Sequence, residues 1–234
     1  MFGRFVHSLV LALLIAACSG AATPAPESAV RVGATASTLP LLREATDRSI
    51  TGSTPFEITA AASNSDLLAK VAGDSVDVGL TLYLPENSIL WAAPLGEERI
   101  AVVVNPTNTT DDLSLLQVQD VFAGRTGGWA VAVREEGDDS RIVFEAMALR
   151  GVKPALTAVV MPSPEAMLKF VAATPNGIGY LPLRWVDDSV KALAIDGRRP
   201  TADDYELKVL IVVVAKAEPT GAAREWLGRV QVVR

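Results

Sequence analysis

The sequence has almost none of the side chains that most often carry nucleophilic catalysis or bind transition metals. It contains one cysteine, Cys18, and one histidine, His7, and both lie within the first eighteen positions. If residues 1–17 are removed as a leader and Cys18 is modified, no histidine and no free thiol remain. Ser-His-Asp and Cys-His pairs and cysteine or histidine metal sites are then excluded. Carboxylate chemistry and calcium binding are not excluded on this ground.

Basic residues are too few and too scattered for nucleic-acid binding. The 234 residues include 21 Lys and Arg against 27 Asp and Glu, a net charge of −6, and no Lys/Arg-rich cluster is present. Because neutralising phosphates needs a basic surface, we expect no nucleic-acid partner. The hydrophobic share of 50% is enough for a sizeable core, in one large domain or in two small lobes.

Residues 1–17 have the pattern of a lipoprotein signal peptide. Arg4 precedes the apolar run SLVLALLIAA, which is shorter than the roughly 20 residues that span a bilayer. The small residues before Cys18 resemble a bacterial lipobox, in which the cysteine is lipidated and becomes the first mature residue. Residues 18–28 are small, polar and proline-bearing, as in a flexible tether. The alternative is an ordinary signal peptide with a cysteine at this place by chance.

From residue 29 onward, strand-like and helix-like segments alternate, which predicts an α/β fold of mostly parallel sheets flanked by helices. The pattern occurs twice, so we expect two lobes with short connections at Asn105-Pro106 and at 179–183, and hinge motion between them. Ser63, Ser114 and Ser163 are expected helix caps. The expected strands are 29–35, 56–62, 76–82, 98–106, 129–135, 155–163 and 177–183.

Five segments together form a recognisable pattern in their order along the chain. They are GATASTLPLL (33–42), AASNSDLLAKVAGDSVDVGL (61–80), IAVVVNPTN with LSLLQVQDVFAGRTGGW (100–129), REEGDDSRIVFE (134–145) and NGIGYLPL (176–183). They resemble the solute-binding proteins of bacterial ABC importers, specifically the phosphate-binding type, over nearly all of 29–231. The resemblance implies a two-lobed Venus-flytrap of the type II periplasmic binding protein kind, with the ligand between the lobes. Lobe one would take 27–104 and 184–234, and lobe two 105–183.

The resemblance also implies a ligand site made of helix N-termini, hydroxyl groups and one arginine, all of which donate hydrogen bonds to an oxyanion. Each candidate has a second interpretation. The Ser and Thr residues are ordinary caps and turn formers, and Arg134 can pair with a neighbouring carboxylate on the surface. The candidates are Thr35, Ser37, Thr38, Ser63, Asn64 and Ser65 in lobe one, and Arg134, Asp139 and Ser140 in lobe two.

Two departures from the family pattern concern this site. Asp138-Asp139-Ser140 replaces a Ser-Gly-Thr helix start, and Thr81-Leu82 replaces a Ser-Asp pair. An aspartate at a helix start competes with an external anion for the N–H donors. Two unit charges about 4 Å apart repel by roughly 1 kcal/mol in water and by about 4 kcal/mol at an effective dielectric near 20. A single carboxylate is still compatible with hydrogen phosphate, because it can accept the ligand's proton.

Three functions therefore stay open. The first is a lipid-anchored, extracytoplasmic and monomeric solute-binding protein, held in the membrane through Cys18. It would deliver an inorganic oxyanion, phosphate first, to the permease of an ABC importer, with no cofactor, no metal and no enzymatic activity. The second keeps the fold but has a diverged or lost anion site, as in a sensory or structural lipoprotein or a binder of another solute. The third is an enzyme with paired carboxylates, for which nothing beyond 135–139 completes a pair.

The four tryptophans, Trp91, Trp129, Trp185 and Trp226, are typical of core or lobe-edge packing rather than of a ligand cleft. Trp185 follows the expected connection at 179–183, so we expect its fluorescence to report lobe closure.

Overall fold

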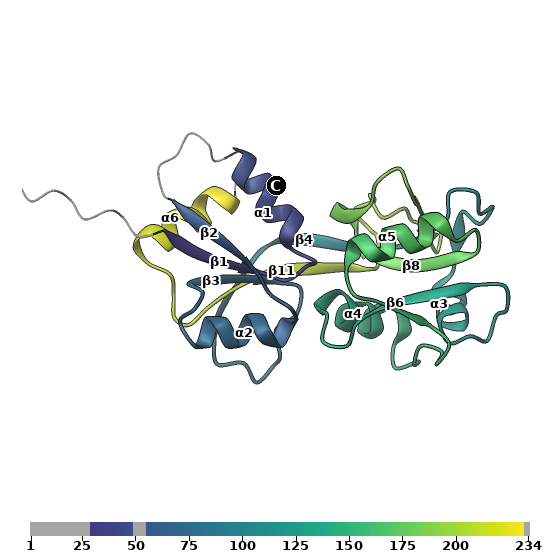
Figure 1. Cartoon of the computed structure of the whole chain (residues 1–234), viewed down its shortest axis with the longest axis horizontal. Helices are drawn as coiled ribbons and strands as arrows, with labels where there is room; N and C mark the ends of the chain where they lie inside the picture. The colour runs from purple at the N-terminus through teal and green to yellow at the C-terminus, as the bar shows by residue number, and fades with distance from the viewer. Residues whose placement is uncertain (1–28, 49–54, 232–234) are drawn as a thin grey trace, which may run out of the picture.

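The computed structural model describes residues 29–48 and 55–231, which form two lobes side by side (Figure 1). The predicted signal peptide, Cys18 and the tether lie outside the described residues. Within the described part of the chain, no helix is both long enough and apolar enough to span a membrane.

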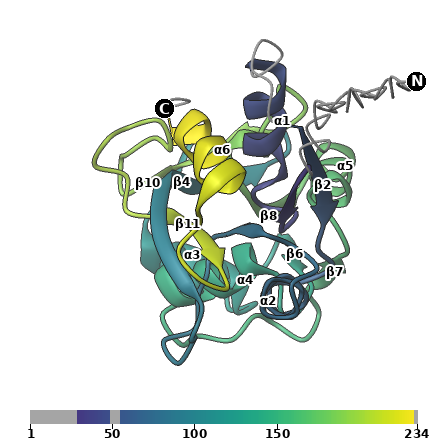
Figure 2. The ribbon, with the colours of Figure 1, turned by 90° about the vertical axis from the view of Figure 1, so that its left-hand side faces the viewer.

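Lobe one is a sheet covered by helices on both faces. Strand β1 pairs in parallel with β2 on one side and with β3 on the other, and β11 continues the sheet as an antiparallel neighbour of β3. Helices α1 and α6 lie over one face and α2 over the other, as the end-on view shows (Figure 2). The elements are β1 (Val30–Ala34), α1 (Leu39–Arg48), β2 (Phe56–Ala60), α2 (Asn64–Ala72), β3 (Val78–Thr81), β11 (Lys208–Ala215) and α6 (Gly221–Gln231).

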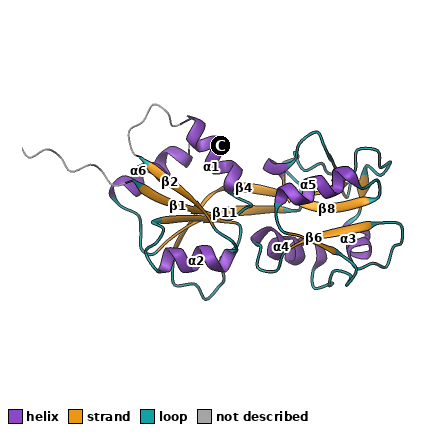
Figure 3. Ribbon diagram, in the orientation of Figure 1, coloured by secondary structure: helices purple, strands orange, loops and turns teal. Residues whose placement is uncertain are grey.

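Lobe two also has strands with helices on both sides. Strand β6 pairs in parallel with β7 and with β8. Helix α5 lies on one side of these strands and α3 and α4 on the other (Figure 3). The elements are β5 (Asp112–Leu113), α3 (Leu115–Phe122), β6 (Ala130–Arg134), α4 (Asp139–Phe144) continued by the π-helical turn η1 (Glu145–Leu149), β7 (Val159–Met161), α5 (Pro164–Ala173), β8 (Gly177–Pro182), the 3-10 turn η2 (Leu183–Trp185), β9 (Lys191–Ala192) and β10 (Ala194–Ile195).

One long strand, β4 (Trp91–Val104), belongs to both lobes. Its first part pairs with β11 as far as Arg99, and its second part pairs with β8 from Ile100 onward. The chain crosses into lobe two inside β4 and returns where residue 207 leads into β11. We therefore propose that the crossings lie at these two places rather than at Asn105-Pro106 and 179–183. The strand continues without a turn from Arg99 to Ile100, so no loop signal marks the point at which it changes partner.

The prediction of an α/β, two-lobed fold is confirmed, but its sheets are mixed rather than mostly parallel. All pairings of β4 and β11 are antiparallel, because the two crossings run in opposite directions side by side. Strand β9 pairs with the end of β4, and β10 pairs with β5. We therefore propose that lobe two also takes residues 184–206, which the division drawn from the sequence gave to lobe one.

The expected helix caps form as predicted. The hydroxyls of Ser63 and Ser163 accept hydrogen bonds from the N–H groups three residues later, and Ser114 forms a reciprocal capping box with Gln117. Pro164 occupies the first turn of α5, where its missing N–H has no cost.

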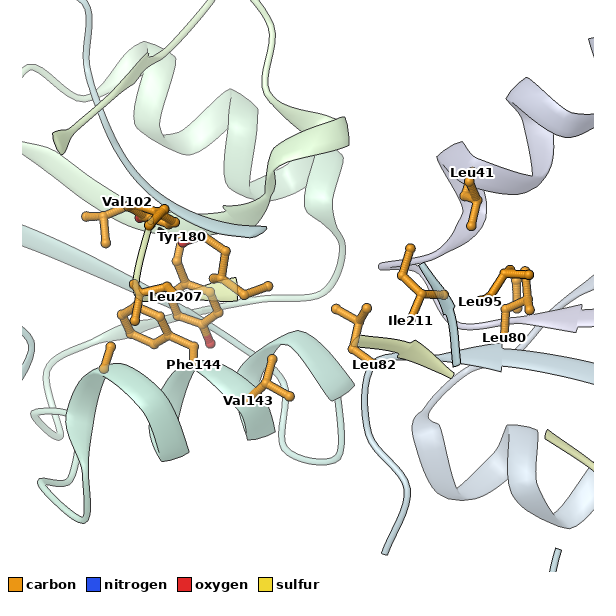
Figure 4. Close-up of a cluster of buried hydrophobic side chains, with 14 of the residues drawn as sticks. Leu41, Leu80, Leu82, Leu95, Val102, Val143, Phe144, Tyr180, Leu207 and Ile211 are labelled. Atoms are coloured by element: carbon orange, nitrogen blue, oxygen red, sulfur yellow. Dashed lines mark hydrogen bonds between the residues drawn. The ribbon is translucent and has the colours of Figure 1, made fainter. Parts of the chain in front are cut away.

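The largest apolar cluster extends through both lobes (Figure 4). In lobe two, the rings of Phe144 and Tyr180 stack with their centroids 3.9 Å apart, and Phe122 packs beside both. The hydroxyl oxygen of Tyr180 accepts a hydrogen bond of 3.0 Å from the backbone N–H of Arg134. The aromatic cluster therefore fixes the end of β6, from which the functional site begins.

We expect Phe144→Ala to lower the free energy of unfolding by about 3–5 kcal/mol, because it leaves a cavity in a fully buried stack. Urea denaturation followed by circular dichroism measures this loss. Leu156→Ala is the control, since the fully exposed Leu156 side chain should change stability by no more than about 0.5 kcal/mol. Equal effects of the two substitutions would contradict the assigned core.

Candidate functional site

The candidate site lies where β1 and β3 end, at the side of lobe one that faces lobe two. The turn between β1 and α1 carries Thr35, Ser37 and Thr38, all at most 3% exposed. The backbone N–H of Thr35 donates to Leu80 O at 3.2 Å, and the Thr38 hydroxyl donates to the same oxygen at 2.9 Å. These bonds tie the turn to β3, so hydroxyl groups from two neighbouring strand ends come together.

A side chain from lobe two enters this set of donors. The carboxyl group of Asp139 accepts hydrogen bonds from Thr35 Oγ1 at 2.7 Å and from Ser37 Oγ at 2.6 Å. It also accepts from the backbone N–H of Leu82 at 2.8 Å and lies 3.0 Å from Thr81 Oγ1. We call these four groups of lobe one, on Thr35, Ser37, Thr81 and Leu82, the donor cradle. Asp139 is fully buried within it.

The loop before α4 explains how Asp139 reaches across. Gly137 has a positive φ of 82°, which turns the chain sharply after β6. Asp138 is the N-cap of α4 and accepts from Arg141 N at 3.2 Å, and its other oxygen pairs with Arg134. Because Asp138 caps the helix, the side chain of Asp139 in the first turn is free to leave its own lobe.

The acidic run 135–139 therefore separates into three environments. Glu135 and Glu136 are exposed to solvent, Asp138 is buried against Arg134, and Asp139 lies in the donor cradle of lobe one. Of the three carboxylates proposed as surface partners of Arg134, namely Glu135, Glu136 and Asp138, only Asp138 pairs with it, and that pair is buried.

Arg134 is buried at the carboxyl end of β6, 3% exposed. Its Nη2 donates to Asp138 Oδ2 at 2.7 Å and its Nη1 to Met161 O at 2.6 Å, while its Nε has no acceptor among the described residues. Such a buried pair is sensitive to loss of one partner, because the other charge is then left uncompensated. Arg134 is thus held in place and largely neutralised by Asp138.

The start of α2 closes one side of the site. The backbone N–H of Asn64 donates to Gly137 O of lobe two at 3.0 Å, and Asn64 Oδ1 accepts from the Thr81 hydroxyl at 2.6 Å. Ser63 caps its own helix, and the exposed Ser65 contacts the Ser63 hydroxyl at 3.0 Å. In this arrangement Asn64 contacts lobe two, whereas Ser63 and Ser65 act within α2.

Trp185 and Arg184 form a further link between the lobes. Trp185 Nε1 donates to Ala36 O at 2.9 Å, between two cradle residues, and Arg184 Nη1 contacts Glu44 Oε2 of α1 at 2.9 Å. The indole of Trp185 is therefore placed to sense a change in the turn that carries Thr35 and Ser37.

Burial raises the pKa of Asp139 above its ordinary value, and the charge of Asp138 raises it further. The hydrogen bonds from Ser37, Leu82 and Thr35 act in the opposite direction, but they do not outweigh the loss of hydration. The buried position thus favours the protonated carboxyl group relative to water.

The sequence analysis identified most residues of this cluster but did not name Thr81 and Leu82 as site residues. Thr35, Ser37 and Asp139 meet directly, Thr38 braces the turn, and Ser140 donates to Asp138. The ligand roles of all nine candidates stay predictions. The cradle members Thr81 and the Leu82 amide were considered only as departures from a family pattern. The parallel pairing of Ala34 with Leu80 was the signal, because adjacent parallel strands end at the same edge.

Among the described residues there is no group of three or more His, Cys, Asp or Glu side chains that could hold a metal ion.

Comparisons with known proteins agree with this geometry. The phosphate-binding protein PstS of Bacillus subtilis (strain 168) is 29% identical over 182 residues, which span 68% of this chain and 60% of that protein. The match thus leaves about two fifths of the relative's length uncovered.

Two solved structures show the same fold. A putative phosphate ABC transporter substrate-binding protein with bound phosphate, from Clostridium perfringens, superposes with a TM-score of 0.79 at 19% identity, over 87% of this chain and 93% of that one. The CcmR regulatory domain of Synechocystis PCC6803 in complex with 2-PG superposes with a TM-score of 0.65 at 15% identity, over 87% and 96% of the two chains.

The resemblance to phosphate-binding-type solute-binding proteins is confirmed, and the fold is that of the type II periplasmic binding proteins. The family model of the LysR substrate binding domain matches residues 28–232, almost the whole chain. The chain belongs to the LysR substrate binding domain family.

Proposed function

We propose that this chain is an extracytoplasmic solute-binding protein that captures a small inorganic oxyanion, phosphate first, between its lobes. It acts by binding rather than by catalysis, is anchored through a lipid on Cys18, and delivers its solute to the permease of an ABC importer. Similarity to PstS and the type II fold support the class of function. The observation that carries the choice of ligand is the donor cradle, whose four groups already hold the two oxygens of a carboxyl group.

The cradle suits an oxyanion because it offers hydroxyl and amide hydrogens and presents no carboxylate of lobe one to the ligand. Such donors, fixed on strand ends and shielded from water, bind anionic oxygen more strongly than they would in solvent. Arg134 lies on the opposite lobe, and its Nε has no acceptor among the described residues. Its charge is shared with Asp138, so the site is held by dipoles more than by net positive charge.

A second candidate function rests on the position of Asp139. Because its carboxyl group occupies the cradle, the lobes can close without any solute. A sensory or structural lipoprotein with a diverged anion site would have this property. Similar folds occur in a phosphate ABC transporter substrate-binding protein and in the CcmR regulatory domain in complex with 2-PG, so the family match does not separate the two functions.

We expect phosphate to raise the melting temperature of the wild-type protein and to change its tryptophan emission, with a smaller response to sulfate and molybdate. A ligand present at 100 times its dissociation constant stabilises the folded state by about 2.7 kcal/mol. The emission change should disappear in Trp185→Phe, because Trp185 donates to the carbonyl between Thr35 and Ser37. Thermal shift and fluorescence titration provide the measurements.

The combined Thr35→Val and Ser37→Ala variant should lose the response to phosphate, since half of the cradle is removed. Thr157→Val, on an exposed loop of lobe two, makes a similar change away from the site and should respond like the wild type. The proposal fails if no oxyanion stabilises the wild-type protein, or if the cradle variant binds phosphate unchanged.

The raised pKa of Asp139 predicts a specific dependence of stability on pH. The native state retains its proton to higher pH than the unfolded chain, whose aspartate titrates near pH 3.9. The contribution of Asp139 is therefore full below about pH 4 and is lost as pH rises through the raised pKa. We expect the stability difference between wild type and Asp139→Asn to shrink as pH is raised from about 4 to 7.

Urea unfolding of both proteins at several pH values tests whether the stability difference shrinks as pH rises. Other titrating groups, such as Asp77 with its pKa lowered by Arg31, act equally in both proteins and cancel in the difference. Parallel stability curves would show that Asp139 has an ordinary pKa.

A further inference from the structure

We propose that Asp139 is a built-in competitor of the solute: its carboxyl group occupies the donor cradle, holds the lobes closed when no solute is present, and must leave before an oxyanion binds. This inference rests on the proposed function, because it concerns affinity at the same cradle. It assigns to one side chain the control of both lobe closure and ligand affinity.

The first observation is that the hydrogen-bond partners of the Asp139 side chain come from the other lobe. Both of its oxygens face Thr35, Ser37, Thr81 and the Leu82 amide, which lie 57 to 104 residues away along the chain. The side chain is fully buried in that position. Opening the lobes breaks all four contacts at once, so the contacts oppose opening as a bound solute would.

The second observation is that burial of Asp139 is not forced by its neighbours. Glu135 and Glu136 of the same loop extend into solvent, and Asp138 already caps α4 and pairs with Arg134. Removing a carboxyl group from water is unfavourable unless hydrogen bonds compensate for it. The cradle provides that compensation, and it does so with the groups that an external anion would use.

Competition of this kind lowers apparent affinity without changing the cradle. The apparent dissociation constant equals the intrinsic one divided by the fraction of molecules in which the cradle is free. If Asp139 fills the cradle in nine molecules out of ten, its removal strengthens solute binding about tenfold. The freed cradle should also accept a small external carboxylate, because it binds one in this structure.

The experiment compares wild type with Asp139→Gly, Asp139→Asn and Glu136→Gln. Asp139→Gly removes the competitor and leaves a space of about the size of acetate. Asp139→Asn keeps the size and loses the charge, and it serves as the second variant if the glycine protein does not fold. Glu136→Gln removes one exposed carboxylate from the same loop and leaves the cradle intact. Titration calorimetry with inorganic phosphate and with acetate measures affinity, and small-angle scattering without solute measures lobe closure.

We expect Asp139→Gly to bind phosphate at least about tenfold more tightly than the wild type and to show a larger radius of gyration without solute. Acetate should stabilise Asp139→Gly and should not stabilise the wild type, whose own carboxyl group fills the space. Asp139→Asn should fall between the two, and Glu136→Gln should match the wild type in both measurements.

Two results would overturn the inference. Phosphate binding by the wild type as tight as by the Asp139 variants would show that no competition occurs, while the proposed function would stand. An Asp139→Gly protein as compact as the wild type without solute would show that Asp139 does not hold the lobes. If instead the glycine variant opens and takes up acetate, yet no variant binds phosphate, the closing role of Asp139 stands and phosphate capture is refuted.

Discussion

The organisation of this protein depends on one buried carboxyl group that belongs to one lobe and is bound by the other. Asp139 extends from the first turn of α4 into hydroxyl and amide donors at the ends of β1 and β3. Its burial is tolerated because hydrogen bonds from Thr35, Ser37 and the Leu82 amide replace those that it loses to water. The same contact joins the lobes and removes the carboxyl group from water, and this burial raises its pKa.

The surrounding structure keeps this contact in register. On the lobe-two side, the stacked rings of Phe144 and Tyr180 fix the end of β6 through the bond from Arg134 N to the tyrosine oxygen. The Arg134–Asp138 pair then sets the loop from which Asp139 departs. On the lobe-one side, two bonds to Leu80 O hold the turn of Thr35 and Thr38 against β3. We expect any rotation of the lobes to occur at β4 and β11, the adjacent strands that pass between them.

The fold and the site carry different kinds of information about function. The LysR substrate binding family and the PstS relative establish a two-lobed receptor architecture. That architecture is shared by transport proteins and regulatory domains, so it does not identify the solute. We propose that the residues in the cradle do, because their donors suit anionic oxygen, and that the internal carboxyl group at the same place sets how strongly an external one can bind.

The sequence by itself determined the class of fold, the helix caps and the membership of most site residues. These features depend on local patterns: strand and helix periodicity, Ser63, Ser114 and Ser163 before helices, and an arginine before a helix start. It did not determine where the chain crosses between lobes, since β4 continues without a break or turn through Arg99 and Ile100, where it changes partner. It also could not show that Asp139 points away from its own helix, or that Thr81 and the Leu82 amide receive it. Those facts concern groups 57 to 104 residues apart, and only the tertiary packing of the two lobes brings such distant donors and acceptor within hydrogen-bond distance.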